Sequence, residues 1–286
     1  MNRPTKRPVV AAVDHAQTSR APLYAAGLLA TLPVAAALFG PLFADAVVPG
    51  AAAPYIGRGG EHPLGTDGLG RDVLALLLRG GRSALGMALG AVAVAYLVGG
   101  AIGLLAASSR RRWADELLIR PLDVLLPLPS LLVISVVAVG WRGSPTAISL
   151  AVAAVNVPPV ARLVRAAALD AASSPVAEAL RVQGESRSRI QLGHIARSAL
   201  APVAADIGTR ITLAVFLVGS ANFLGLGLSP TAPDWAVSIS RSREGLLLQP
   251  WAVLAPAVLL VMFTVGLNLL ADRALARSRT PSTEAR

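Results

Sequence analysis

Six long stretches of this chain carry no charged residue, and they limit the possible fold more than any other feature. They are Ala21–Ala44, Ser83–Ser109, Val124–Trp141, Gly143–Ala161, Ile211–Pro233 and Gly245–Ala271. Each stretch is long enough for one helical crossing of a bilayer, which takes about 17 to 25 residues. Hydrophobic residues make up 54% of the chain, above the roughly 45 to 50% of a soluble domain. The sequence therefore predicts an all-α, polytopic membrane protein with six transmembrane helices.

The basic residues predict the orientation of these helices. If the N-terminus is cytoplasmic, eighteen Lys and Arg residues lie in the inner segments and seven in the outer ones, with Arg210 near the start of the fifth stretch. Lys and Arg concentrate on the cytoplasmic side of membrane proteins. We therefore expect the chain in the cell (inner) membrane, with both termini in the cytoplasm. The net charge of +10 then reflects topology. Because aromatic residues are only 4% of the chain, a nucleic-acid partner is not expected.

This topology divides the chain into five parts. We expect a cytoplasmic N-terminal arm at 1–20, a first transmembrane helix at 21–44, an outer segment at 45–82, a core at 83–271 with five more transmembrane helices, and a cytoplasmic tail at 272–286. A cleaved signal peptide is the alternative for the first stretch. Its apolar run exceeds the usual 7 to 15 residues or so of such peptides, which favours a membrane helix.

A polar connector at about 166–200 separates the fourth and fifth stretches. Ser174 and Pro175 predict a helix start, and Glu178 lies near the positive end of that helix. Gly184 predicts a left-handed stop. A helix this short is not stable alone in water, so it must dock on something. A second, basic helix is expected from about Ser186 to Ala199. The alternative is a solvated connection between two spans.

The connector resembles the EAA loop of importers of the ATP-binding-cassette (ABC) type. The pattern of that loop is Glu-Ala-Ala, three residues, Gly, and then about ten residues to Ile-Leu-Pro. Glu178-Ala179-Leu180 and Gly184 match its spacing, and Ile195 stands at the position of its Ile. This chain has Leu180 in place of the second Ala and Ala196-Arg197 in place of Leu-Pro. The resemblance implies that Glu178, Ala179, Leu180, Gly184 and Ile195 couple the chain to an ATPase.

A second segment narrows the family. His62-Pro63-Leu64-Gly65-Thr66-Asp67, followed by Gly70-Arg71-Asp72, is similar to the outer segment before the second span in the C-type permease subunit of dipeptide, oligopeptide and nickel importers. Asn222-Phe223-Leu224-Gly225 and the residues up to Leu228 resemble the fifth span of that subunit. The resemblance covers roughly 61–276. It implies the permease fold of type I ABC importers and a peptide or a related solute, such as nickel, as cargo.

The same resemblance implies partners. They are a second homologous permease subunit, two ABC ATPase subunits, a solute-binding protein outside the cytoplasmic membrane, and the membrane lipid itself. ATP binding to the ATPases would move the Pro175–Ala199 element as a rigid handle. No Walker loop of the Gly-x4-Gly-Lys-Ser/Thr kind occurs in the sequence, so ATP must be hydrolysed by the partner subunits. No cofactor and no catalytic residue are expected in this chain.

A metal site is the alternative for the outer motif, because one imidazole and two carboxylates lie close together at His62, Asp67 and Asp72. Glycines between them and the single histidine favour a turn with solvated charges. The family resemblance implies instead that Asp67 and Arg71 are tied into the local fold at the outer end of the pathway. We therefore expect no metal.

Two other classes of function remain as alternatives. A polytopic membrane enzyme needs a nucleophile with a base, or metal ligands, at membrane depth, but no His or Glu lies inside a predicted span. A secondary transporter favours buried carboxylates. The one candidate, Asp206, lies at the edge of the fifth span, four residues before Arg210, and we expect the two to pair. The cargo stays open among dipeptides, oligopeptides, nickel chelates and glycosides.

Overall fold

The computed structural model describes residues 21–44, 52–109 and 112–279. Every regular element in those ranges is a helix, and a single isolated bridge between Thr66 and Asp72 is the only β pairing there. The predicted all-α class is confirmed. The predicted N-terminal arm at 1–20, the start of the predicted outer segment at 45–51 and the end of the predicted tail at 280–286 lie outside the described residues.

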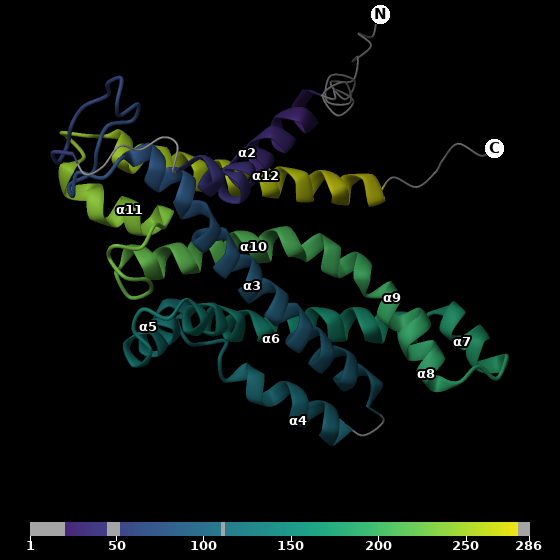
Figure 1. Cartoon of the computed structure of the whole chain (residues 1–286). Helices are drawn as coiled ribbons and strands as arrows, with labels where there is room; N and C mark the ends of the chain where they lie inside the picture. The colour runs from purple at the N-terminus through teal and green to yellow at the C-terminus, as the bar shows by residue number, and fades with distance from the viewer. Residues whose placement is uncertain (1–20, 45–51, 110–111, 280–286) are drawn as a thin grey trace, which may run out of the picture.

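Among the described residues, five helices have the length and composition to cross a membrane. They are α2 (Ala21–Ala44), α3 (Val73–Ser108), α6 (Pro145–Ala172), α10 (Leu200–Phe223) and α12 (Trp251–Arg279). In Figure 1 they run roughly lengthwise through the molecule, with α2 beside α12 and α3 crossing the bundle. The chain is thus a multi-pass membrane protein. α3 begins ten residues before the predicted span, because Asp72 caps it: its Oδ1 accepts a hydrogen bond of 2.9 Å from the Ala75 amide.

The predicted third span, Val124–Trp141, is not one long helix. An amphipathic helix, α4 (Arg112–Asp123), ends before it, turns occupy 124–129, and α5 (Ser130–Gly140) has only 11 residues. At 1.5 Å per residue, α5 is about 16 Å long, short of the roughly 30 Å of a bilayer core. Pro127 and Pro129 explain the break, because proline removes a helical hydrogen bond and disfavours helix in the residue before it. A count of six crossings remains a prediction.

Close packing between α3 and α6 depends on two glycines of α3. A Cβ atom on Gly99 would lie 2.8 Å from the Val157 carbonyl oxygen, and one on Gly103 would collide with the Ala161 carbonyl oxygen. Only glycine permits this approach. Another glycine pair on the same helix, Gly86 and Gly90, has no atom of the structure within 4 Å of an added Cβ. That pair does not pack against any other described part of the chain.

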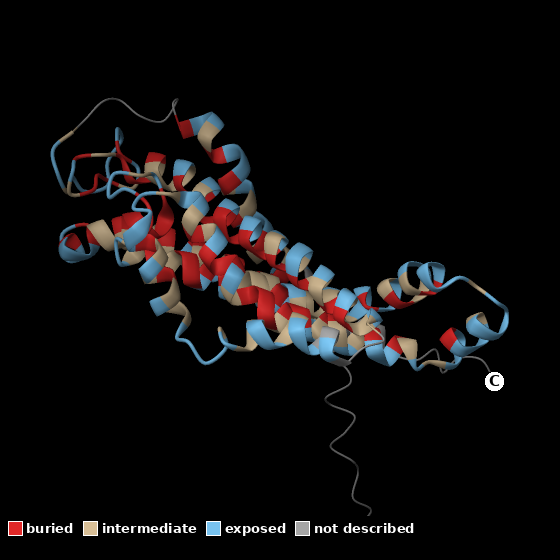
Figure 2. Cartoon of the chain, turned by 90° about the horizontal axis from the view of Figure 1, so that it is seen from below, coloured by how far each residue is buried: buried red, intermediate tan, exposed pale blue. Residues whose placement is uncertain are grey.

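The main core lies where α3, α5, α6 and α10 meet α11 (Trp235–Ser242), and Figure 2 shows buried residues gathered along this middle. Trp235 is fully buried, and its indole N–H donates a hydrogen bond of 2.8 Å to the Leu77 carbonyl. The 52–72 loop and α11 lie at one end of the bundle, and the helix pair that follows α6 lies at the other (Figure 1). The chain therefore presents two different ends, one at each side of the span region.

Candidate functional site

The connector between α6 and α10, here residues 173–199, folds as short helices. α7 (Pro175–Val182) is followed by α8 (Arg187–Arg189), the π-helical turn η1 (Ile190–Ile195) and α9 (Ala196–Ser198). Ser174 caps α7 as predicted, since its hydroxyl accepts from the Ala177 amide at 3.3 Å. The same hydroxyl lies 3.1 Å from Nε2 of His194, which ties the start of α7 to η1. Gly184 ends α7 with a φ of +79°, the predicted left-handed conformation.

One face of the connector packs on the bundle. Ile190 and Ile195 are buried in a small cluster with Ala168 and Ala171 of α6, and Leu180 packs against it. Ala177 is fully buried as well. Backbone hydrogen bonds connect η1 and α9 to α10. The Ala199 amide donates to the Ile195 carbonyl at 3.1 Å, and the Val203 amide donates to the Ala199 carbonyl at 3.2 Å. The connector is thus continuous with a membrane helix and has its own small core.

The opposite face of the connector is exposed and partly apolar. Of the five predicted coupling residues, Glu178, Ala179 and Gly184 lie exposed, whereas Leu180 and Ile195 hold the connector on α6. Exposed apolar side chains lie on the same short helices, among them Val176, Val182 and Leu192, with Val182 at 81% exposure. The sequence pattern did not single these three out, because burial in so short a segment depends on the tertiary contacts. An exposed face of this kind indicates a protein partner.

The arginines at the start of the connector are paired locally. The Arg181 guanidinium lies 3.3 Å from the Glu178 carboxylate and donates to the Ala172 carbonyl at 2.8 Å. Arg189 lies 3.3 Å from the Glu185 carboxylate. Both pairs are exposed to solvent, where such contacts contribute little to stability. They therefore set the charge pattern of the exposed face rather than its fold.

The 52–72 loop is built from buried polar groups that bind one another. His62 Nδ1 lies 2.9 Å from Asp72 Oδ2, and both residues are buried. The Thr66 hydroxyl donates to the Ala53 carbonyl at 2.7 Å and accepts from the Ile56 amide at 2.8 Å. These bonds close the loop on itself and on the start of α3.

Glycines and one amide side chain complete the loop. Gly65 and Gly70 have φ near +75° and +71°, and a Cβ on either would collide with a backbone carbonyl, that of Ile56 or of Ala52. The Gln249 side chain donates to the Ile56 carbonyl at 2.8 Å and to the Leu64 carbonyl at 3.1 Å. Pro63 is exposed at the surface of the loop. The loop is thereby anchored beside the start of α12.

Asp67 lies at the centre of a buried ionic cluster. Its carboxylate accepts from the amides of Leu69 and Arg71 at 2.9 Å each. The guanidinium groups of Arg71 and Arg241 lie 3.1 Å and 3.2 Å from Oδ2. The same two arginines donate to the carbonyls of Thr231 and Pro230 in the loop before α11. Asp67 and Arg71 are thus tied into the local fold, and the cluster joins the 52–72 loop to α11.

The metal alternative finds no support in this geometry. His62 pairs with Asp72, whereas Asp67 is occupied by two arginines. Within the described ranges, no three His, Asp or Glu side chains are grouped as metal ligands. Another buried carboxyl, that of Asp234, caps α11 and accepts from the Ser83 hydroxyl at 2.7 Å. Burial raises the pKa of the Asp234 carboxyl, but its contacts are those of a structural cap.

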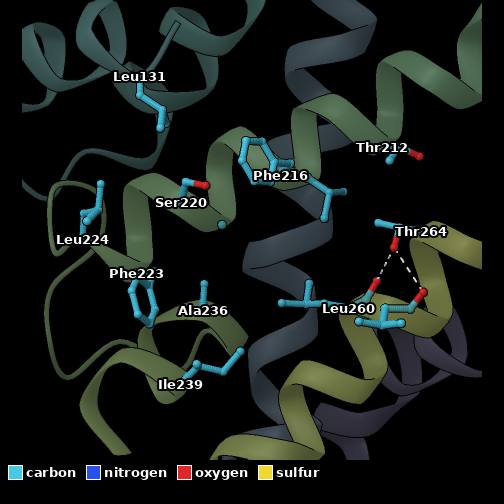
Figure 3. A pocket seen from close by; sticks show the side chains of 13 residues that line it. Leu131, Thr212, Phe216, Ser220, Phe223, Leu224, Ala236, Ile239, Leu260 and Thr264 are labelled. Carbon is cyan, nitrogen blue, oxygen red and sulfur yellow. Dashed lines mark hydrogen bonds between the residues drawn. The ribbon is translucent and has the colours of Figure 1, made fainter. Parts of the chain in front are cut away.

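A cavity of about 560 Å³ lies between α5, α10, α11 and α12 (Figure 3). Its walls are apolar side chains with a few hydroxyl groups, and the thirteen lining residues include no charged one. Phe216 and Phe223 of α10 point from the same wall, and Leu260 faces them from α12. The Thr264 hydroxyl donates back to its own helix, to the carbonyls of Leu260 and Val261. The cavity is open on one side. It can hold a solute or an apolar segment, but it offers no acid, base or nucleophile pair.

Asp206 and Arg210 form the predicted pair. Arg210 Nε donates to Asp206 Oδ2 at 2.8 Å, and the Tyr96 hydroxyl donates to the same oxygen at 2.9 Å. The carboxylate is therefore neutralised where α10 meets α3. A paired carboxylate does not provide the free acid that ion coupling in a secondary transporter favours.

Comparison with known proteins covers most of the chain. Residues 99–279 match the family described as binding-protein-dependent transport system inner membrane component. A dipeptide transport system permease protein of Alkalihalophilus pseudofirmus is 34% identical over 217 residues, which are 76% of this chain and 71% of that protein. A glutathione transport system permease protein of Pectobacterium atrosepticum is 32% identical with the same coverage. A probable D,D-dipeptide transport system permease protein of Escherichia coli K12 is 30% identical over 74% of this chain and 70% of its own length.

Proposed function

This chain belongs to the binding-protein-dependent transport system inner membrane components, and we propose that within this family it is a permease subunit of a peptide importer. It assembles with a second, homologous permease subunit, two ABC ATPase subunits and an external solute-binding protein. The cargo is a di- or oligopeptide, in line with the dipeptide and glutathione permeases that the chain is similar to.

The exposed face of the connector carries this proposal. The lining of the cavity has no charged group that could couple transport to ions, so uptake against a gradient needs another source of energy. The connector is the element on which a soluble ATPase can dock. Val176 and Val182 flank Glu178 and Ala179 on an exposed helix. In water these apolar side chains favour burial against a partner. We assign the partner as an ATPase subunit and the connector as cytoplasmic, with both termini on the same side.

The helix path explains how the ATPase would act on the pathway. A displacement of α7 is passed to η1 through the cluster of Leu180, Ile190 and Ile195. It then reaches α10 through Ala199, whose amide donates to the Ile195 carbonyl and whose carbonyl accepts from the Val203 amide. Because α10 supplies Phe216 and Phe223 to the cavity wall, movement of the connector changes the width of the cavity. ATP is hydrolysed in the partner subunits, and this chain converts their motion into access for the solute.

Affinity purification and uptake together test the proposal. We expect the tagged chain, extracted from membranes, to co-purify with two ATPase polypeptides and a second permease. We also expect deletion of the gene to abolish uptake of a labelled dipeptide, and the restored gene to recover it. Purification as a homogeneous chain without any ATPase, together with undiminished uptake in the deletion strain, would reject the assignment.

A further inference from the structure

We propose that Arg243, at the outer rim of the cavity, binds the C-terminal carboxylate of the transported peptide, an inference that rests on the proposed function. Arg243 follows α11 in the 3-10 turn η2 (Arg243–Gly245). Its guanidinium carbon lies 5.9 Å from the centroid of the Phe223 ring. Phe223 in turn lines the cavity (Figure 3). Arg243 therefore stands at the rim, with its charge exposed.

A second arginine lines an adjoining pocket. Arg142, just after α5, forms the wall of a pocket of about 480 Å³ together with Gly143 and the 225–230 turn. This pocket and the cavity share the end of α10, because Leu224 lines the cavity and the next residue, Gly225, lines the pocket. Both spaces therefore have an arginine beside the end of α10.

The charge of both arginines is available to a ligand. Arg71 and Arg241, in contrast, are bound to the buried Asp67 and to backbone carbonyls. None of the ion pairs formed among the described residues involves Arg142 or Arg243, although Glu244 follows Arg243 directly. Two exposed guanidinium groups without a carboxylate partner can bind an anion by charge-assisted, bidentate hydrogen bonds.

The shape of the site selects a peptide carboxylate over other anions. A peptide carries a carboxylate at one end and side chains of mixed polarity along its length. The cavity beyond the rim is apolar and has no charged group, so it accepts the side chains but does not stabilise a free carboxylate. With its carboxylate held at Arg243, the peptide can place its apolar part against Phe223 and Phe216. The rim thus sets the orientation in which the peptide enters.

Uptake of a matched pair of peptides tests this site. Cells that lack their own copy of the gene receive the wild-type chain, Arg243→Gln, Arg243→Lys or the control Arg58→Gln. Arg58 is also an exposed arginine over an aromatic ring, 3.6 Å from the centroid of Trp251, but Trp251 lines neither space, whereas Phe223 beside Arg243 lines the cavity. The labelled probes are one dipeptide and its C-terminal amide. Dividing each uptake rate by that of wild type removes the preference of the binding protein, which is the same in all strains.

We expect Arg243→Gln to lower uptake of the dipeptide at least about five-fold, because a charge-assisted hydrogen bond is lost, and to leave uptake of the amide within about two-fold of wild type. Arg243→Lys and Arg58→Gln should retain most uptake of both probes. Equal uptake of the dipeptide by wild type and Arg243→Gln would overturn the site. An equal loss for dipeptide and amide would overturn it too, since the arginine would then meet a carboxylate of the docking protein. If wild type takes up no peptide, the proposed function itself fails.

Discussion

The two ends of the bundle differ in how their polar and apolar groups are satisfied. At one end, the 52–72 loop buries His62, Thr66, Asp67 and Asp72, and each of them is bound by other residues of this chain. At the other end, the connector leaves its ion pairs and several apolar side chains exposed. The buried polar side chains of the 52–72 loop thus find their partners within the single chain. The second end has a small core on one side and, on the other, a surface suited to a partner.

The largest effect on stability is expected at the buried ionic cluster. Asp67 is only 1% exposed and pairs with Arg71 and Arg241. Asp67→Ala leaves two guanidinium groups without their carboxylate, and breaking such a buried pair costs about 3 to 5 kcal/mol. The melting temperature of the purified chain in detergent should fall clearly. In Glu116→Ala, which removes an exposed partner of Arg120, it should hardly change. Equal melting temperatures of the two variants would show that the ionic cluster around Asp67 does not stabilise the loop.

A smaller effect is expected at the turn of the connector. Gly184 has a φ of +79° and nothing within 4 Å of an added Cβ, so Gly184→Val meets backbone strain and no clash. The left-handed conformation then costs on the order of 1 kcal/mol or more, which misplaces α7 and lowers uptake while the chain still inserts. Gly193→Val is the matched control, since Gly193 has equal space and no positive φ. Uptake at the wild-type rate in Gly184→Val would argue against the connector as a rigid handle.

The smallest effect on the fold is expected at the exposed face. Glu178 is exposed and pairs with the exposed Arg181. Glu178→Lys should therefore change the free energy of unfolding by no more than a surface ion pair contributes, about 0 to 1 kcal/mol. Recovery of the ATPase with the tagged chain should nevertheless fall, because the substitution reverses a charge on the docking surface. Glu116→Lys, on α4, should leave that recovery unchanged. Full recovery of the ATPase with Glu178→Lys would show that the ATPase does not dock on this helix.

Much of this architecture can be read from the sequence where local chemistry decides it. Ser174 and Gly184 fix the start and the stop of α7 by rules that involve only neighbouring residues. Long apolar runs predict the spans by the same kind of local argument. The family suggested by the 62–72 and 178–195 segments is confirmed by the match over 99–279 and by relatives of 30 to 34% identity.

The break in the third stretch follows from Pro127 and Pro129, a local signal that a hydropathy average does not register. Other features depend on contacts between distant segments and could not be predicted. The cavity combines one face of α10 with residues of α5, α11 and α12, such as Leu131 and Leu260, that lie far apart in the sequence. The second arginine on Asp67, Arg241, lies 174 positions away in the chain. Only the folded structure brings these groups together.

Labelling of single cysteines tests the central claim, that the connector faces the cytoplasm and the 246–249 segment faces outward. The chain has no cysteine, so Val182→Cys and Leu247→Cys each create one reactive thiol at positions 81% and 98% exposed. With a membrane-impermeant maleimide, the account predicts that intact cells are labelled at Leu247→Cys only, and at Val182→Cys only after permeabilisation. Labelling of Val182→Cys in intact cells would contradict the account, because no cytoplasmic ATPase could then reach the connector.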